Sequence, residues 1–275
     1  MSSESTHTQV GQLLLRMHYQ DLVRRGIALP DFADVEFRCH SQNGEDGILL
    51  YLFSLLGTTN RRVVEICAGD GVECNAANLI LNHGWLGLLI DGDPDNIARG
   101  KDFYATCRTT WPSPPAVVQA WVTTDNVNQL VIAHGYAGPV DLLSLDLDGN
   151  DYWIWRALDA IAPRVVVLEF NAAWGCERSV TIPYDPGFRL DLSNPPYRCG
   201  ASLPAFTRLA RAKGYRLVGV QSFGVNAFFV RNGIAEDLLP ERSPRELFET
   251  TERLRAWEPG WVASMVAGGQ VWEDV

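Results

Sequence analysis

From residue 62 onward, short apolar runs alternate with stretches of helical periodicity, and this alternation constrains the fold more than any other feature of the chain. The first five apolar runs are Val63–Cys67, Leu86–Ile90, Ala116–Trp121, Val140–Leu145 and Val165–Phe170, with helical stretches near 75–83, 94–104, 125–134 and 151–161 between them. Strands that alternate with helices form βαβ units, whose right-handed crossovers place parallel strands in one sheet with helices on both faces. The sequence therefore predicts a doubly wound α/β fold.

Two more apolar runs follow, Arg216–Val220 and Ala227–Val230. Only Gln221–Asn226 separates them, which is too short for a helical crossover, so we expect them to form an antiparallel hairpin. The predicted sheet is thus seven-stranded and mainly parallel, with an N-terminal helical extension ahead of it.

The chain divides into three parts around this sheet. They are an N-terminal helical extension or lid at 1–60, a Rossmann-like catalytic domain that binds the cofactor at 61–235, and a C-terminal helical tail at 236–275. The Pro-rich segment 171–202 is expected to be a lid or substrate loop, because loops of this length in compact domains are usually functional or disordered. The aromatic residues expected to line a pocket there are Trp174, Tyr184 and Tyr197.

Composition narrows the class of partner. The chain has 275 residues, a formal charge of −10 and a pI near 5.0, without the basic stripe that nucleic-acid binding needs. No apolar run approaches the length of a membrane span, and the six cysteines lack zinc spacing, as is typical of buried thiols in a reducing compartment. We therefore expect a cytoplasmic enzyme with a small-molecule substrate. A predicted helix over Pro244–Trp257 has an apolar face that packs at home or in a homo-oligomer.

A glycine turn follows the first strand, in the segment Glu65-Ile-Cys67-Ala-Gly69-Asp70-Gly71. Glycines let the backbone pass close to a ligand, and the helix that follows offers free N–H groups. Doubly wound sheets bind ligands at the carboxyl ends of the strands, where the strand order reverses. The next strand ends at Asp91, at the spacing where an acidic residue accepts hydrogen bonds from both ribose hydroxyls of a cofactor.

Two adenosine cofactors fit this turn to different degrees. The GxGxxG fingerprint of NAD fails because Cys74 stands at its third position, and the Glu65 carboxylate would face a pyrophosphate badly. The same carboxylate suits the cationic amino-acid end of S-adenosylmethionine (SAM), so the turn favours SAM over NAD. The residues expected to contact SAM are Glu65, Ala68, Gly69, Gly71, Asn75, Asp91, Gly92, Asp93, Thr123 and Asp146.

Four segments, in order along the chain, resemble the FkbM-like class I SAM-dependent methyltransferases. The fourth strand ends in Asp146-Leu-Asp148-Gly149-Asn150-Asp151, similar to that family's Asp-x-(Asp/Glu)-Gly-x-(Asp/Glu) motif, and Pro163–Glu169 resembles its next strand. Ser41–Asp46, together with the stretch from Gly200 through Lys213-Gly214-Tyr215 to Gly224–Phe229, is similar to a bacterial subgroup of the family. The resemblance covers roughly residues 40–231, with one departure: Cys67 replaces the first glycine of the usual turn.

The resemblance implies roles for the polar residues at the ends of the fourth and fifth strands. Asp146 and Asp148 would lie over the sulfonium and the acceptor, with Tyr152 beside them and Glu169 as a further base or orienting group. Clustered carboxylates also suit Mg²⁺, and the expected ligands are Asp148, Glu169 and Asn171. For Asp151, a helix-capping role and a metal role are equally compatible with its position.

The histidines carry weaker signals. His40, just ahead of Ser41, is a candidate general base. His83 and His134 stand where helices are expected to end, and there the interaction of an imidazole with the helix dipole explains them without a catalytic role.

Three functions remain open at this point. The first is SAM-dependent O-methylation of a small hydroxylated metabolite or sugar. The second is a SAM cyclase or lyase that releases methylthioadenosine without transferring methyl, which the Cys67 departure and the N-terminal helices keep open. The third is a SAM-binding module without catalytic activity, because a fold does not determine a function.

Overall fold

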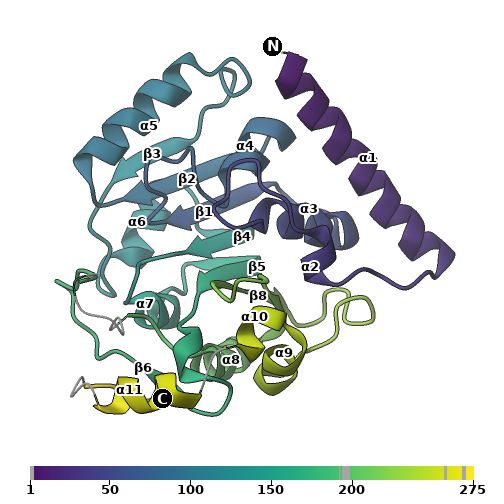
Figure 1. Cartoon of the computed structure of the whole chain (residues 1–275). Helices are drawn as coiled ribbons and strands as arrows, with labels where there is room; N and C mark the ends of the chain where they lie inside the picture. Colours follow the sequence, from purple (N-terminus) through teal and green to yellow (C-terminus); the bar gives the residue numbers. More distant parts are fainter. Residues whose placement is uncertain (1–2, 192, 194–198, 257–258, 268–270) are drawn as a thin grey trace.

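The computed structural model describes residues 3–191, 193, 199–256, 259–267 and 271–275. Its centre is a seven-stranded sheet in the order β3-β2-β1-β4-β5-β8-β7 (Figure 1). The strands are β1 (Arg62–Ile66), β2 (Leu86–Asp91), β3 (Ala116–Gln119), β4 (Gly138–Leu145), β5 (Ile161–Glu169), β7 (Tyr215–Val220) and β8 (Asn226–Arg231). The first five are parallel, and β8 runs antiparallel between β5 and β7. The predicted seven-stranded, mainly parallel sheet is confirmed.

Helices cover both faces of the sheet. The helices that follow strands are α4 (Ala77–His83), α5 (Pro94–Thr106), α6 (Val127–Ala133), α7 (Asp151–Ala157) and α8 (Leu203–Ala212). Successive strand residues point to opposite faces, so Val63 packs in one core with α4 and α5, and Val64 in another with α6, α7 and α8. Both valines are fully buried, which explains why the strands read as continuous apolar runs.

The N-terminal extension consists of α1 (Ser3–Arg25), α2 (Phe32–Val35) and α3 (Glu45–Leu56). Figure 1 shows α1 beside α3 at the border of the molecule. Both helices end at the glycines that the sequence indicated, Gly26 and Gly57, each with a φ of 63°. The apolar residues of α3 join the core on the α4 side of the sheet.

Two predicted helices differ from those observed. The helix expected over 151–161 ends at Ala157, because Ile161 already pairs with Gly138 in a fifth strand longer than the apolar run suggested. The helix expected over Pro244–Trp257 is two helices, α9 (Pro244–Thr250) and α10 (Glu252–Arg255), since Thr251 is extended; Trp257 lies outside the described residues. Leu247 and Leu254 are buried in the chain's own core.

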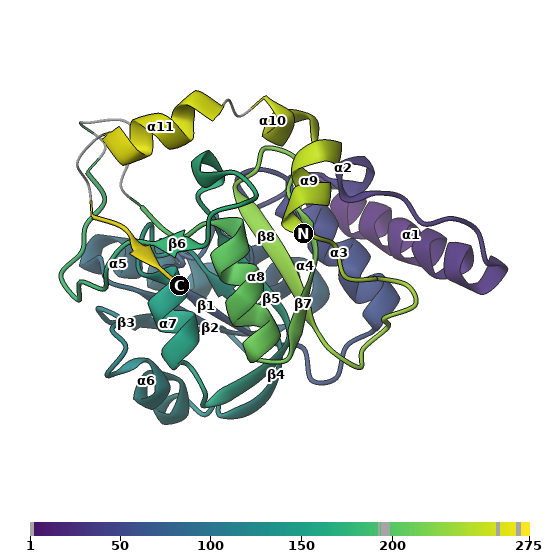
Figure 2. The same cartoon turned by 90° about the horizontal axis from the view of Figure 1, so that it is seen from below.

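The long segment after β5 contains a short helix, η1 (Ala172–Trp174), and β6 (Val180–Thr181), which pairs with β9 (Glu273–Asp274) near the C-terminus. Figure 2 shows α9, α10 and the last helix, α11 (Pro259–Ala267), following one another along one border of the molecule. Trp174 is 1% exposed and packs on Trp272, so it is core and not pocket lining. Tyr197 lies outside the described residues. None of the described helices is long and apolar enough to cross a bilayer.

Candidate functional site

The glycine turn lies between β1 and α4, at the point where the strand order reverses from β1 to β4. Its backbone is left-handed at three positions, with φ of 62° at Cys67, 57° at Gly69 and 71° at Gly71. A Cβ at Gly71 would stand 2.7 Å from a methyl carbon of Leu89, so only glycine fits there. The Ala68 N–H donates to the carbonyl of Ile90, which ties the turn to β2.

Cys67 has a left-handed backbone, a conformation that favours glycine. A left-handed φ costs a residue with a side chain about 1 kcal/mol. Burial raises the pKa of the Cys67 thiol, and the negative charges of Asp151, Asp91, Asp146 and Asp148 raise it further. The thiol therefore lies among the carboxylates of the site and stays protonated at neutral pH.

Glu65 lies at the end of β1 and organises the chain ahead of α4. Its buried carboxylate accepts hydrogen bonds from the backbone N–H groups of Asn75 (3.0 Å) and Ala76 (2.6 Å), just ahead of α4, and from the Ser144 hydroxyl (3.1 Å). The Asn75 amide also donates to Ser144. The first N–H groups of a helix lack partners within it, and a buried carboxylate needs donors, so the two satisfy each other. The expected role of Glu65 toward the cationic end of the cofactor stays a prediction.

Asp91, at the end of β2, connects the turn to the second strand. Its carboxylate accepts from the N–H of Gly69 at 2.9 Å and from the N–H of Asp93 at 2.8 Å. Asp93 in turn caps α5, accepting from the N–H groups of Asp95 and Asn96. Asp91 is thus placed beside the turn as expected, whereas the carboxylate of Asp93 is used by its own helix.

Trp121, just beyond β3, is an exposed residue of the carboxyl edge that the expected site does not include. Its ring lies over Gly92, where an added Cβ would stand 2.9 Å from it, and it is 44% exposed. The Arg189 guanidinium lies over the ring, 4.6 Å from its centroid, so the ring already makes a cation–π contact. The place of Trp121 at this edge was predictable, because it ends the third apolar run. Thr123, two residues later, uses its backbone to begin α6.

Three carboxylates converge at the ends of β4 and β5. One oxygen each of Asp146, Asp148 and Glu169 lies within 4.8 Å of one oxygen of each other residue. Burial raises the pKa of all three, Asp146 shares a hydrogen bond with Glu169, and repulsion from Asp146 raises the pKa of Glu169 further. Asp148 is the most exposed of the three, and its backbone is left-handed with φ of 59°. The group as a whole favours a cation.

Asp151 belongs to the turn and not to this cluster. It is 1% exposed and accepts from the backbone N–H groups of Leu147 (2.7 Å) and Gly149 (3.1 Å), so it holds the turn that carries Asp148. Burial raises its pKa to about 7, helped by the charge of Asp146.

Two expected site residues have structural partners of their own. The Tyr152 ring packs against Trp153 and Phe206, because one residue along a helix turns its side chain about 100° away from that of Asp151. The Asn171 side chain accepts from the N–H of Ala173 and donates to the carbonyl of Cys199, so it organises η1, and its expected role as a metal ligand stays a prediction. The carboxylate that the structure brings together with Asp148 and Glu169 is Asp146.

The segment 36–46 folds onto the carboxyl edge of the sheet from the N-terminal side. The His40 Nδ1 lies 3.2 Å from the carbonyl of Val72, next to the glycine turn. Glu45, fully buried at the start of α3, accepts from the Asn226 amide at 2.8 Å, and Asn226 pairs with Glu169 across β5 and β8. His40 is therefore near the cofactor turn, and Glu45 is near the carboxylate cluster.

Residues 182–189 cover the same edge from the other side. Tyr184 accepts from the N–H of Thr124 at 3.0 Å, and the carbonyl of Pro186 accepts from the Trp121 ring nitrogen at 2.6 Å. Phe188 lies so close to Gly149 that a Cβ there would overlap its ring. The segment expected to be a lid thus touches residues that follow β3 and β4.

No protein-family model and no curated protein sequence matches this chain. The solved structures to which its fold is similar include a SAM-dependent methyltransferase from Clostridium acetobutylicum, 10% identical, covering 79% of this chain and 98% of that one with a TM-score of 0.44. Magnesium protoporphyrin IX methyltransferase from Synechocystis, with bound SAM, is 13% identical over 68% of this chain and 78% of its own, with a TM-score of 0.44. The glycopeptide N-methyltransferase MtfA, complexed with sinefungin, is 14% identical over 69% and 87%, with a TM-score of 0.42.

These three structures are methyltransferases, and their similarity to this chain is one of fold. At TM-scores below 0.5, the similarity adds nothing to what the chain's own strand order and side chains say about its function. Those residues carry the proposal that follows.

Proposed function

We propose that this chain is a SAM-dependent methyltransferase that methylates an oxygen of a small hydroxylated molecule, such as a sugar or a specialised metabolite. The observation that carries this proposal is the meeting of the glycine turn with the carboxylates. The Asp146 N–H donates to the carbonyl of Ile66, so the end of β4 adjoins the turn at the end of β1, where strand order reverses. The resemblance of the Asp146–Asp151 and Ser41–Asp46 segments to FkbM-like methyltransferases supports the same proposal.

In this reaction, an acceptor oxygen attacks the methyl carbon, the bond from carbon to sulfur breaks, and S-adenosylhomocysteine leaves. The protein has to align donor and acceptor and take the hydroxyl proton. We assign the proton to Asp148, the most exposed carboxylate, because burial raises its pKa and makes it a better base. The Asp146–Glu169 pair orients the acceptor, and the positive sulfonium is stabilised by the carboxylates around it.

The donor set at this edge also fits Mg²⁺, which prefers carboxylate oxygens. Asp146, Asp148 and Glu169 would hold the ion, with Asp146 in place of the expected Asn171. Bound there, Mg²⁺ would supply Lewis-acid polarisation of an acceptor hydroxyl. His40, next to the turn, would then border the cofactor and not take the acceptor proton.

One observation favours the cyclase or lyase as a second candidate. The segment 36–46 packs on the carboxyl edge next to the glycine turn, through His40 and Val72 and through Glu45 and Asn226. A segment packed there leaves less room for a separate acceptor, which suits a reaction of SAM on itself. The product separates the two functions, because this reaction releases methylthioadenosine and methyl transfer releases S-adenosylhomocysteine.

The first test is a calorimetric titration of the chain with SAM, S-adenosylhomocysteine and NAD, each with and without Mg²⁺. We expect SAM to bind and Asp91→Asn to weaken it about 10- to 100-fold, since a hydrogen bond to a charged group contributes about 1.5–3 kcal/mol. Asp95→Asn, an exposed position on α5, is the matched control and leaves binding unchanged. Tight binding of NAD, or of neither SAM nor its product, contradicts the proposal.

The second test is turnover with a panel of hydroxylated acceptors, with both adenosine products measured. Asp148→Asn should lower turnover about 100-fold or more while SAM still binds, because general-base catalysis contributes about 10²–10⁴. His40→Ala should keep most of the turnover. Release of methylthioadenosine in the absence of any acceptor would replace the proposed reaction with the second candidate.

A further inference from the structure

A cavity lies at the opposite end of the sheet from the glycine turn. It is lined by α1, α3, α4 and the loop ahead of β1, is partly open to solvent, and has a volume of about 60 Å³. Arg61 directly precedes β1, and Trp85 directly precedes β2, so the cavity is at the amino ends of these strands. Leu50, Phe53 and Trp85 form apolar walls. Since one water needs roughly 10–15 Å³ on this measure, the cavity admits a group of about four to six non-hydrogen atoms.

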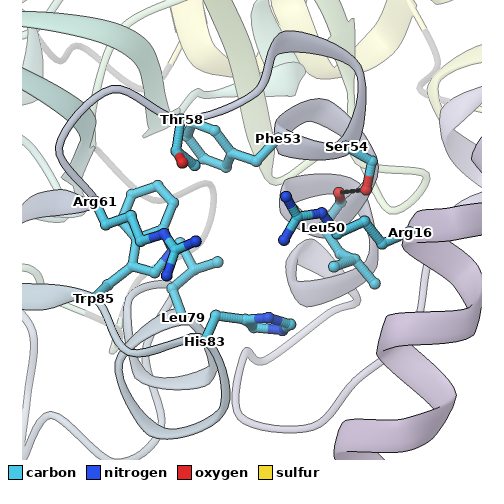
Figure 3. A pocket seen from close by; sticks show the side chains of 9 residues that line it. All are labelled: Arg16, Leu50, Phe53, Ser54, Thr58, Arg61, Leu79, His83 and Trp85. Carbon is cyan, nitrogen blue, oxygen red and sulfur yellow. Dashed lines mark hydrogen bonds between the residues drawn. The ribbon is translucent and has the colours of Figure 1, made fainter. Parts of the chain in front are cut away.

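Three basic side chains line this cavity, and no carboxylate does. Figure 3 shows Arg16 reaching in from α1, Arg61 from the opposite wall and His83 from the end of α4, all directed at the same space. Within the part of the chain that the structure describes, neither guanidinium has a hydrogen-bond or ion-pair partner. In contrast, Arg24 and Arg25, further along α1, both pair with Asp21. The chain as a whole is acidic, with a net charge of −10. Unpaired guanidinium groups that share one cavity therefore indicate a binding site for an anion.

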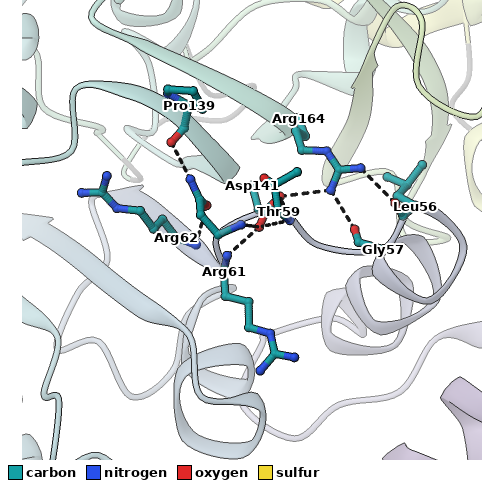
Figure 4. Close-up of polar contacts among 9 residues, drawn as sticks. Leu56, Gly57, Thr59, Arg61, Arg62, Pro139, Asp141 and Arg164 are labelled. Carbon is teal, nitrogen blue, oxygen red and sulfur yellow. Dashed lines mark hydrogen bonds and ion pairs between the residues drawn. The ribbon is translucent and has the colours of Figure 1, made fainter.

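A group of buried hydrogen bonds to Asp141, called the clamp below, fixes the backbone at Arg61. The fully buried Asp141 carboxylate accepts from the backbone N–H groups of Thr59, Asn60 and Arg61, at 2.6–3.0 Å, and from the Arg164 guanidinium at 3.0 Å (Figure 4). Arg164 also donates to the carbonyls of Leu56 and Gly57. Arg61 adopts a φ of 52°, which is unfavourable for a residue with a side chain, and the clamp holds it there. The clamp thereby fixes the backbone from which the exposed Arg61 side chain reaches the cavity.

His83 is oriented as well. Its Nε2 lies 2.5 Å from the Gln12 carbonyl oxygen, which also accepts from the Asn78 amide at 3.0 Å. Because that oxygen is an acceptor, Nε2 carries the proton, and Nδ1 is left to take up a second one. Burial, with the positive charges of Arg16 and Arg61, lowers the pKa of His83 to about 4. A bound anion would offset those charges and favour the imidazolium.

We propose that this cavity is a binding site for a tetrahedral oxyanion: phosphate, or the terminal phosphoryl group of a phosphorylated small molecule. Its volume admits one such group, and guanidinium groups are the side chains best suited to phosphate. The donors reach the cavity from α1, the loop and α4, which matches oxygens directed around a tetrahedron better than the two coplanar oxygens of a carboxylate. The apolar walls keep the charges partly away from solvent and strengthen the attraction. This inference does not depend on the proposed function.

The test is a calorimetric titration of the full chain with inorganic phosphate and with sulfate, at constant ionic strength adjusted with chloride. Both anions should bind, and Arg16→Gln and Arg61→Gly should each weaken binding about tenfold or more, as expected for a lost charge-assisted hydrogen bond. Glycine suits the φ of residue 61, so this variant keeps the fold, which circular dichroism verifies. Arg25→Gln removes the same charge from the same helix outside the cavity and should leave affinity unchanged.

Glycerol phosphate, with glycerol as its uncharged control, identifies the source of the anion. At least threefold tighter binding than inorganic phosphate assigns the site to a phosphorylated molecule, whereas equal or weaker binding assigns it to free phosphate. The inference is overturned if neither anion binds beyond the effect of chloride, or if Arg25→Gln weakens binding as much as Arg16→Gln does.

Discussion

The two ends of one sheet carry opposite charge. At the carboxyl edge, Asp91, Asp146, Asp148 and Glu169 gather around the glycine turn. At the amino edge, Arg16, Arg61 and His83 line a cavity without a carboxylate. In a parallel sheet with crossover helices, helix N-termini lie at the carboxyl edge and helix C-termini at the amino edge. The helix dipole therefore favours carboxylates at the first edge and cations at the second.

The two edges differ in whether their charged side chains have partners within the protein. The carboxylates of Glu65 and Asp93 take the free N–H groups at the starts of α4 and α5, so their charge is used by the fold. The guanidinium groups of Arg16 and Arg61 have no such partner in the described residues. The amino edge therefore keeps the unpartnered guanidinium groups on which the proposed anion site rests, whereas the motifs of the sequence lie at the carboxyl edge.

The largest expected effect comes from removing the clamp that holds the amino edge together. Asp141→Asn leaves Arg164 and the backbone N–H groups of residues 59–61 without their buried anion, and should lower the free energy of unfolding by about 3–5 kcal/mol. Urea denaturation measures this loss. Calorimetry should also show weaker phosphate binding, because the clamp positions the backbone of Arg61. SAM affinity at the carboxyl edge should stay within about twofold, because Asp141 lies within β4 and five residues of extended chain, roughly 16 Å, separate it from Asp146.

Its pH dependence gives a second check. Burial would raise the pKa of Asp141, but hydrogen bonds from Thr59, Asn60 and Arg164 outweigh it and hold the pKa below its usual value. Its stabilisation is therefore present above the unfolded pKa and is lost as pH falls through the folded one. The difference between wild type and Asp141→Asn should shrink only in strong acid. The control Asp159→Asn breaks an exposed pair with Lys213 and should cost less than about 1 kcal/mol.

The fold was largely predictable from the sequence because buried parallel strands read as apolar runs. The strands and their parallel or antiparallel directions follow from that pattern, and the glycine turn and the acidic residues stand at strand ends that it marks. The alternation alone does not distinguish the observed strand order from those of other doubly wound folds. Glu65 marks a limit of prediction from sequence. Its place near the end of β1 is predictable, but the sequence does not show that the backbone N–H groups of residues 75 and 76 donate to its carboxylate. The same limit holds for Tyr152 and Asn171, since the sequence does not show that the Tyr152 ring packs on Phe206 or that the Asn171 side chain accepts from the N–H of Ala173.

The amino-edge cavity was not predictable at all. Arg16, Arg61 and His83 come from three elements that are far apart in sequence, and only the packing of α1 on α3 brings them together. His83 was interpreted as a histidine favoured by the dipole at the end of α4. Its lowered pKa is the opposite of that expectation, because burial and two guanidinium groups outweigh the dipole.

An effect of intermediate size is the pH dependence of stability, which tests whether the cavity at the amino edge carries excess positive charge. Because the pKa of His83 is lowered to about 4 from 6.5, the unfolded chain binds more protons between those values, and stability falls as pH drops through them. The charged groups that line the cavity with it are Arg16 on α1 and Arg61 on the loop. His83→Gln should abolish about 2 kcal/mol of this loss, less than the full shift implies because the ring is partly exposed. Denaturation at pH 6.5 and pH 4 measures it.

Sulfate sharpens that measurement, because it does not titrate in this range. Bound sulfate should raise the pKa of His83 back toward its usual value and reduce the wild-type loss between pH 6.5 and pH 4. The corresponding loss in His83→Gln should not change, although sulfate bound to Arg16 and Arg61 stabilises that variant at both pH values. Parallel curves for both proteins, with and without sulfate, would show that the cavity carries no excess positive charge, and would remove the contrast between the two edges.

The smallest expected effect belongs to the carboxyl edge and rests on the proposed function. Cys67 occupies a left-handed position where glycine is unstrained, and its side chain narrows the approach of a cofactor to the turn. Cys67→Gly should bind SAM about threefold more tightly, with the free energy of unfolding changed by less than about 1 kcal/mol, because relief of strain offsets the lost packing. Cys67→Ala keeps the β-carbon and should behave like wild type. If Cys67→Gly instead binds SAM more weakly and Cys67→Ala shares the defect, the thiol itself contacts the cofactor. Cysteine at position 67 would then serve the function of the carboxyl edge, as the unpaired arginines serve the proposed anion site at the amino edge.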